Sequence, residues 1–171
     1  MKSTYLAAAA LAAVLALPGL AAQAQTNEIN IGITVVTTGP AAALGIPERN
    51  ALEFVPKQIA GIPLKLTVVD DAGDPTTATT NTRRFVTEQK ADIIMGSSNT
   101  PATIAVSNVA NEAGIPHLGL APFPITPERA KWSVALPQPI PIMGKVLYEH
   151  MKAHGIKTVG YIGYSDSYGD L

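Results

Sequence analysis

The segment 93–107 (IIMGSSNTPATIAVS) joins a predicted buried strand to a predicted helix through polar residues that carry no charge. The joint contains Ser97, Ser98, Asn99 and Thr100. Free backbone N–H groups and the positive end of a helix dipole meet at such a joint and favour a bound anion. The hydroxyls add neutral donors, so the loop suits a carboxylate that is bound reversibly. The alternative is an ordinary N-cap, in which Asn99 or Thr100 bonds to its own helix.

The acidic stretch 70–75 (DDAGDP) is the second group of residues with chemical potential. Three acids this close together could bind a metal, but no histidine or further oxygen ligand lies nearby, and calcium takes about six to eight oxygen ligands. We therefore expect structural roles. Asp70 ends a strand, Asp74 caps the next helix with Pro75 at its first position, and Asp71 faces solvent or the loop. The sequence predicts no metal and no other cofactor.

The histidines and remaining hydroxyls form no catalytic pattern. His117 lies within a short predicted strand and is interpreted as structural, whereas His150 and His154 lie near a helix C-terminus, where cations favour the dipole. The stretch GYSDSYG lacks nucleophile-elbow spacing, and the chain has neither a Walker loop nor a G-x-G-x-x-G motif. Without a nucleophile, base and orienting group in register, we do not expect an enzyme.

Strand and helix patterns alternate along the chain. The patterns predict a doubly wound parallel α/β sheet, in which ligands bind beyond the carboxyl ends of the strands. Pro47 is placed at the start of the first helix, and Pro56 is expected to kink or end it. The predicted strands are 28–36, 64–69, 91–95, 115–120, 132–136 and 157–163, and the predicted helices are 47–59, 75–90, 101–113 and 142–151. The loops expected to meet at the ligand are 37–44, 70–74, 97–100 and 119–124.

Residues 1–24 have the pattern of a cleaved secretory signal peptide. Lys2 is followed by the apolar run 6–17 and by the small-x-small tripeptide 22–24. The apolar run is shorter than the roughly 20 residues that a spanning helix requires. The chain contains no cysteine, which suits export to a bacterial periplasm. We expect a periplasmic protein.

The charge balance excludes partners that bind through a basic surface. The whole chain carries 12 basic and 13 acidic residues, and removal of Lys2 with the signal leaves 11 and 13, a net charge of −2. A domain that binds nucleic acid or anionic lipid normally carries a basic patch. Neither partner is therefore predicted.

Several segments, in their order and spacing, resemble one known family. They are INIGITV, TTGP, DDAGDP, MGSSNTPATIAVSNVANEAGIP and VGYIGYSDSYG, within residues 28–171. The sequence resembles the periplasmic solute-binding proteins of branched-chain amino acid type ABC transporters (the leucine/isoleucine/valine-binding family, with the type I periplasmic-binding-protein fold). The resemblance implies a small carboxylate ligand, a membrane permease as partner and no cofactor, and we expect a monomer. The alternatives are a ligand-sensing lobe of a receptor and a small α/β enzyme.

The resemblance also implies roles for individual residues. Thr100 matches the hydroxyl that binds the ligand carboxylate, and Ala121 matches a residue whose backbone meets the ligand. Tyr168 matches a tyrosine at the mouth of the second lobe, and Leu44 lies where amino-acid-binding relatives often have an aromatic. The full candidate ligand-binding set is Leu44, Ser97, Ser98, Thr100, Ala121, Pro122, Phe123 and Tyr168.

Phe123 departs from the family pattern. Amino-acid binders have a threonine there, which helps to hold the ligand's charged groups. A phenylalanine offers a ring instead, which could contribute about 0.5–1.5 kcal/mol by stacking on an aromatic ligand. We hypothesise a carboxylate with an aromatic or otherwise apolar body; the alternative is that Phe123 packs in the hinge.

The resemblance implies two lobes, of which this chain contains little more than one. We expect the first ligand-binding lobe at 25–141 and a crossover with the start of the second lobe at 142–171. Family members are longer, so the chain is interpreted as truncated, with a half-site that remains open and binds weakly. The 142–163 region is expected to expose apolar surface.

Overall fold

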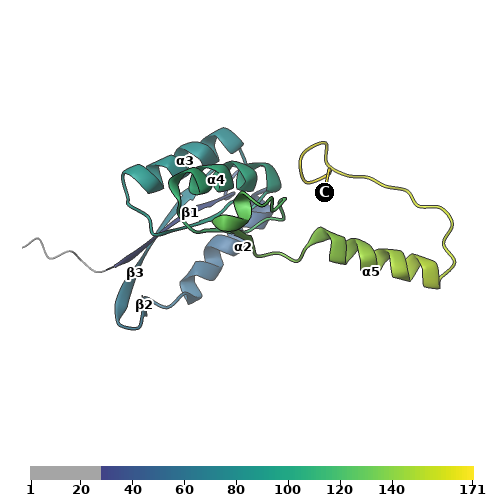
Figure 1. Cartoon of the computed structure of the whole chain (residues 1–171), viewed down its shortest axis with the longest axis horizontal. Coiled ribbons are helices and arrows are strands. Elements are labelled where there is room, and N and C mark those ends of the chain that lie inside the picture. Colours follow the sequence, from purple (N-terminus) through teal and green to yellow (C-terminus); the bar gives the residue numbers. More distant parts are fainter. Residues whose placement is uncertain (1–27) are drawn as a thin grey trace, which may run out of the picture.

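A six-stranded sheet forms the centre of the protein, which is described by a computed structural model over residues 28–171 (Figure 1). The predicted signal peptide at 1–24 lies outside these residues. The strand order is β2-β3-β1-β4-β5-β6, and all neighbours are parallel except β2 and β3. The strands are β1 (Ile29–Val35), β2 (Gln58–Ile59), β3 (Ile62–Asp70), β4 (Ile93–Gly96), β5 (His117–Gly119) and β6 (Ser133–Ala135).

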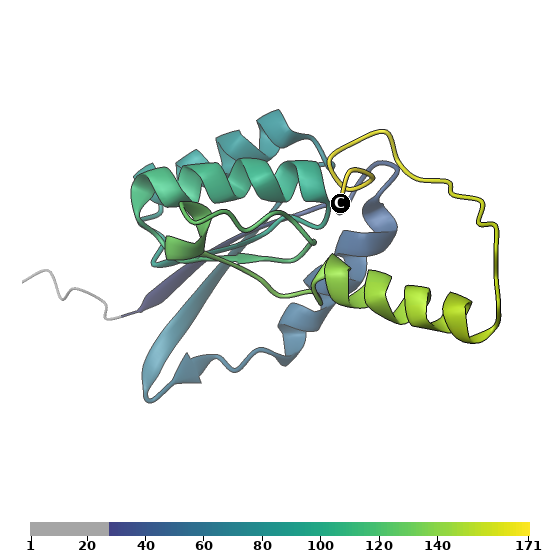
Figure 2. The ribbon, with the colours of Figure 1, turned by 45° about the vertical axis from the view of Figure 1, so that its right-hand side comes forward.

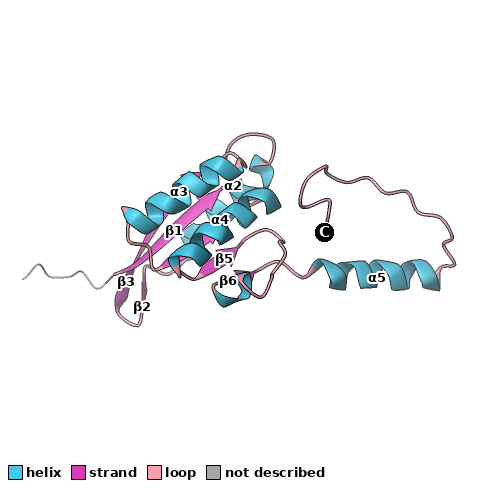
Figure 3. Ribbon diagram, turned by 45° about the horizontal axis from the view of Figure 1, so that its top comes forward, coloured by secondary structure: helices cyan, strands magenta, loops and turns pink. Residues whose placement is uncertain are grey.

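The helices lie on both faces of this sheet, which confirms the predicted doubly wound architecture. α3 and α4 pack side by side on one face, and α2 lies on the other (Figures 1 and 3). α5 extends away from the sheet (Figure 1), and none of its residues is buried. The helices are α2 (Ala42–Ala51), α3 (Pro75–Thr87), α4 (Thr100–Ala113) and α5 (Ile140–Ala153), with 3-10 turns at Leu52–Phe54 and Arg129–Lys131.

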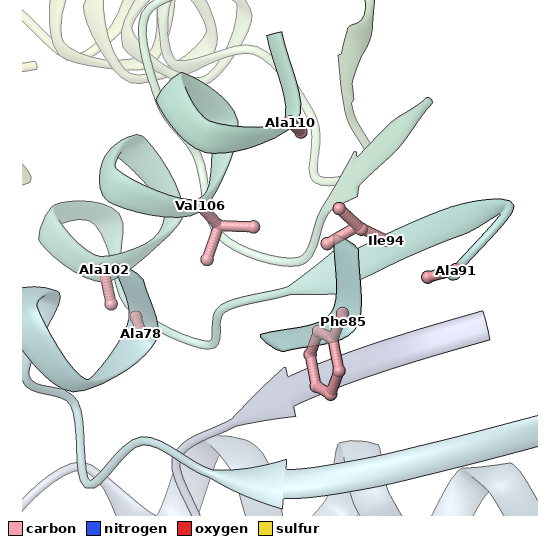
Figure 4. Packing of buried hydrophobic residues seen from close by; sticks show 7 residues of the cluster. All are labelled: Ala78, Phe85, Ala91, Ile94, Ala102, Val106 and Ala110. Atoms are coloured by element: carbon pink, nitrogen blue, oxygen red, sulfur yellow. The ribbon is translucent and has the colours of Figure 1, made fainter. Parts of the chain in front are cut away.

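The main core lies between the sheet and the α3–α4 layer (Figure 4). Phe85 of α3 is fully buried there, and a Cβ at Gly32 of β1 would overlap its ring. The absence of a side chain at Gly32 therefore makes room for the phenylalanine. Burial of such a side chain contributes roughly 1.5–3 kcal/mol relative to exposure. The cluster comprises Ala78, Phe85, Ala91, Ile94, Ala102, Val106 and Ala110.

The start of α3 and the end of α4 lie where their capping residues predict. The Asp74 carboxylate accepts a hydrogen bond from the backbone N–H of Thr77, with Pro75 as the first residue of α3. α4 ends at Gly114, whose φ of 68° is left-handed and favours glycine. These boundaries confirm the prediction, because capping residues act over a few neighbouring positions.

The first helix is placed differently from the prediction. α2 begins at Ala42, within the predicted loop, so Pro47 lies inside the helix rather than at its start. The alanines before Leu44 are strong helix formers and extend the helix backwards. The helix ends before Pro56, as a proline's missing N–H requires.

The predicted strand at 157–163 is wrong. These residues form no strand and are exposed, with Ile162 at 96% exposure. A strand requires a hydrogen-bonded neighbour, and among the described residues none pairs with this segment. The apolar residues of this segment alone do not supply that neighbour. As expected, this region and α5 expose apolar side chains.

Candidate ligand-binding site

The candidate site lies where the carboxyl ends of β1 and β4 meet. Thr34 pairs with Gly96 at this edge of the sheet. The chain leaves β1 toward β3 on one side and leaves β4 toward β5 on the other. This divergence creates the crevice in which doubly wound sheets bind ligands.

A cavity of about 580 Å³ occupies this crevice. The loops after β1, β4 and β5 line it, together with α2 and the C-terminal segment. In Figure 2 that segment, coloured yellow, curls next to the ends of α2 and α4. The structure brings six of the predicted residues together here: Leu44, Ser98, Thr100, Ala121, Pro122 and Tyr168.

Two predicted residues, Ser97 and Phe123, do not line the cavity. Ser97 is fully buried, and its hydroxyl donates to Oδ2 of Asp71 at 2.7 Å. Phe123 is 6% exposed and packs against His117, with ring centroids 5.7 Å apart. A Cβ at Gly119 would overlap the Phe123 ring, so the ring lies tightly against β5. Its position follows the packing alternative rather than a face that stacks on a ligand.

Asp71 organises the polar layer beneath the cavity. Its carboxylate accepts hydrogen bonds from Thr34 Oγ1 at 2.8 Å, Ser97 Oγ at 2.7 Å and Gly73 N–H at 2.9 Å. The prediction that Asp71 faces solvent or the loop is wrong, since its backbone N–H donates to the Val35 carbonyl and the turn folds inward. This buried carboxylate joins β1 to the loop after β4.

Asp70 fixes the turn that precedes α2. Desolvation acts to raise its pKa, but hydrogen bonds from the Thr38 hydroxyl and the backbone N–H groups of Ala72 and Thr37 outweigh this and lower the pKa to about 2. The carboxylate is therefore ionised throughout the physiological range. It holds residues 37–38 against the end of β3 and directs the chain into α2.

Asn99 and Thr100 anchor the N-terminus of α4. The Asn99 side chain accepts from the Ala102 N–H at 2.9 Å, so the N-cap alternative describes Asn99. It also donates to the Gly73 carbonyl at 2.9 Å. Thr100 Oγ1 donates to the Pro122 carbonyl at 2.6 Å, which ties α4 to the segment after β5. The Thr100 proton is thus already used within the protein, although its oxygen can still accept.

Glu48 is a cavity-lining residue that the sequence reasoning missed. Its Oε2 accepts a hydrogen bond from Ser98 Oγ at 2.5 Å, and Ser98 Oγ accepts from the Val36 N–H at 3.0 Å. Burial raises the pKa of Glu48, and the negative charge of Asp71 raises it further. The hydrogen bond from Ser98 acts in the opposite direction but does not cancel the increase. Leu44 and Glu48 are four residues apart, so a helix that begins at Ala42 places them on the same face. This spacing is the sequence signal that could have identified Glu48 as a cavity residue.

Gly45 allows α2 to approach the end of β1 closely. It is buried, and a Cβ there would overlap the Val36 carbonyl and lie 2.7 Å from Ser98 Oγ. The backbone of α2 therefore lies directly beside the Val36–Ser98–Glu48 hydrogen bonds. Leu44 and Glu48 reach the cavity because of this approach.

His117 supports the site from the core, as expected of a structural residue. Its Nε2 lies 2.6 Å from the Gly96 carbonyl and its Nδ1 lies 3.1 Å from Ser133 Oγ. The carbonyl can only accept, so Nε2 carries the proton and Nδ1 accepts from the serine. Burial lowers the pKa of His117 to about 4, against a smaller upward effect of the Gly96 hydrogen bond.

Residues 28–171 show neither a metal-binding cluster nor a membrane-spanning helix. No group of three or more His, Asp or Glu side chains in this range is placed to hold a metal ion. Within the same range, no helix has the length and apolar character needed to cross a bilayer.

Comparison with known proteins identifies the family. The sequence profile described as periplasmic binding protein matches residues 28–171. The chain belongs to this family. A search of curated proteins found no match.

Solved structures of periplasmic binding proteins and related receptors share this fold. An extracellular ligand-binding receptor from Rhodopseudomonas palustris HaA2 is 79% identical, with a TM-score of 0.83 over 84% of this chain. Rp1789 from Rhodopseudomonas palustris CGA009 is 82% identical, with a TM-score of 0.82 over 84% of this chain. The chain spans about 40% of the length of each.

A more distant structure shows the fold alone. The solute-binding protein of an ABC transporter from Rhodopseudomonas palustris BisB5, in complex with 3,4-dihydroxybenzoic acid, is 21% identical. Its TM-score is 0.76, over 84% of this chain and 41% of that one. The type I lobe architecture is therefore shared across a wide range of sequence identity.

Proposed function

We propose that this protein is the substrate-binding component of an ABC importer and delivers a small carboxylate to a membrane permease. The observation that carries the proposal is the cavity beyond β1 and β4. It is lined by the N-terminus of α4 and by the side chains of Ser98 and Thr100. The first turn of a helix favours an anion. Membership of the periplasmic binding protein family supports the binding role.

The walls of the cavity favour a ligand with an apolar body. Leu44, Ala121 and Pro122 line it, and none of its described lining residues is basic. The ligand's negative charge would therefore be held by backbone N–H groups and neutral donors, which suits a ligand that must later be released. Both a branched-chain amino acid and an aromatic acid fit this description.

The cellular setting completes the proposal. Residues 1–24 would direct the chain to the periplasm as a cleaved signal peptide. Residues 25–141 would form the first lobe and 142–171 the start of a second. We propose that the protein acts as a monomer and catalyses no reaction.

Equilibrium dialysis of residues 25–171 tests the binding role. The ligands are leucine, valine, benzoate, 4-hydroxybenzoate and, as a neutral control, glucose. We expect saturable binding of one carboxylate class and recovery of the ligand unchanged. Chemical conversion of the ligand would instead support an enzyme, and binding of glucose alone would contradict the carboxylate site.

Transport is tested separately from binding. The protein, its ligand and a candidate ABC permease would be combined in proteoliposomes, and ATP hydrolysis would be measured. We expect the ligand-loaded protein to stimulate hydrolysis. Binding without stimulation of any co-expressed permease would favour the alternative of a ligand-sensing receptor lobe.

A further inference from the structure

We propose that occupation of this cavity by a carboxylate is coupled to protonation of Glu48, which frees the Ser98 hydroxyl to donate to the ligand. The inference rests on the proposed function and concerns the same site. It follows from the hydrogen bonds that connect Val36, Ser98 and Glu48. Glu48 is thereby assigned as a residue that positions the Ser98 proton.

Ser98 has a limited hydrogen-bonding capacity. Its hydroxyl carries one proton and two lone pairs. One lone pair accepts from the Val36 N–H at 3.0 Å, and the proton is donated to Glu48 Oε2 at 2.5 Å. While Glu48 is ionised and accepts this proton, Ser98 cannot also donate to a ligand carboxylate.

Protonation of Glu48 resolves this conflict without breaking the Val36 bond. The Glu48 carboxyl then becomes a donor to the second lone pair of Ser98, and the Ser98 proton turns toward the cavity. Every donor and acceptor of the hydroxyl is used in this arrangement. The proton comes from solvent, so one proton is taken up for each carboxylate bound.

The charges around Glu48 favour this proton uptake. Asp71 faces it from the turn after β3 and acts to raise its pKa, as burial does. Asp166, Tyr164 and Tyr168 face the same cavity from the C-terminal segment, and the loops after β4 and β5 bring no charged side chain to it. On α2 itself, the guanidinium of the adjacent Arg49 bonds to Asn50 Oδ1. An arriving carboxylate adds a further negative charge, which favours the neutral form of Glu48.

Isothermal titration calorimetry of residues 25–171 tests the coupling. Leucine and 4-hydroxybenzoate serve as probes, in buffers of different ionisation heat between pH 6 and pH 8. We expect uptake of up to one proton per bound carboxylate. Affinity should fall by about tenfold per pH unit wherever free Glu48 is ionised.

Three variants test whether Glu48 is the residue that takes up the proton. In Glu48→Gln the amide N–H donates to Ser98 permanently, as the protonated acid would, so binding should become independent of pH with no proton uptake. Glu53→Gln, an exposed acid just after α2, is the matched control and should keep the wild-type pH dependence. Ser98→Ala should weaken binding and abolish the uptake.

The outcomes separate this inference from the proposed function. If neither probe nor any other carboxylate binds, both fail. If a carboxylate binds with no proton uptake, or if Glu48→Gln retains the pH dependence, this inference alone is overturned. In the free protein, carbon-13 NMR titration of the Glu48 carboxyl should give a pKa above its ordinary value. A pKa at or below that value would also overturn the inference.

Discussion

Acid should destabilise this protein through His117 as the pH falls from 7 toward 4. The imidazole is buried between the Gly96 carbonyl and the Ser133 hydroxyl, and its pKa falls from 6.5 to about 4 on folding. The unfolded chain therefore binds a proton on His117 in the window between these values, and the folded protein does not. The free energy of unfolding must then fall as the pH is lowered through this window.

The size of the effect follows from the two pKa values. Linkage gives a loss of about 2 kcal/mol between pH 7 and pH 5 from His117 alone. This is a large fraction of the roughly 5–15 kcal/mol that stabilises a typical domain. Below about pH 4 the folded form also binds the proton, and the contribution of His117 stops changing.

Urea denaturation at a series of pH values measures the effect. The single tryptophan, Trp132, reports unfolding by fluorescence. Its backbone carbonyl accepts a 2.7 Å hydrogen bond from the backbone N–H of His117, so it lies beside the titrating residue. His117→Gln keeps a polar side chain but cannot titrate. The difference between the two profiles isolates His117, because other titrating groups are shared.

The comparison uses the change in the free energy of unfolding with pH, not the absolute stability of the two proteins. We expect the wild type to lose about 2 kcal/mol more than His117→Gln from pH 7 to pH 5. Parallel profiles for the two proteins would refute the reasoning that His117 is held neutral by burial.

Three further predictions concern the elements that position the site. Gly45→Ala should displace α2 from Val36 and Ser98 and so lower both the melting temperature and the ligand affinity. The control is Gly144→Ala, because a Cβ at this exposed position of α5 meets no other atom. It should leave the stability unchanged or raise it by up to about 1 kcal/mol. Equal effects of the two glycine substitutions in thermal melts would contradict the close approach. Asp71→Ala leaves three donors without their acceptor and should cost at least about 3 kcal/mol in urea denaturation; a loss under 1 kcal/mol would argue against a buried network. Asn99→Ala removes the α4 N-cap and should cost about 1 kcal/mol by the same assay, and an unchanged stability would show that the cap is not needed.

Local signals in the sequence predicted most of the first lobe. The apolar run at β1, the Asp74 cap and the left-handed Gly114 each depend on a few neighbouring residues, so the sequence carries them directly. The α4 cap was left open between Asn99 and Thr100, and the structure assigns it to Asn99. The alternation of these elements then leads to the parallel sheet and its ligand crevice. The start of α2 was missed because Pro47 resembles a first-turn proline. The alanines before Leu44 and the packing of Gly45 on Val36 instead favour a helix that begins at Ala42.

The roles of individual site residues were harder to predict. Six candidates face the cavity because their loops lie at the correct edge of the sheet, which topology determines. Whether a side chain points toward the cavity or the core depends on tertiary contacts. Ser97 turns inward to Asp71, and Phe123 turns inward to His117 and Gly119. The burial of Asp71 and the Ser98–Glu48 contact join residues that are far apart in sequence, so spacing alone does not reveal them.

The most direct test of the central claim is thermal melting of residues 25–171 with a panel of small carboxylates. A ligand at 100 times its dissociation constant should add about 2.7 kcal/mol, which raises the melting temperature by several degrees for a domain of this size. We predict such a shift with one class, either branched-chain amino acids or aromatic acids, and its loss in Gly45→Ala measured against Gly144→Ala. A cooperative melt that no carboxylate shifts would contradict the claim that this cavity binds a small carboxylate.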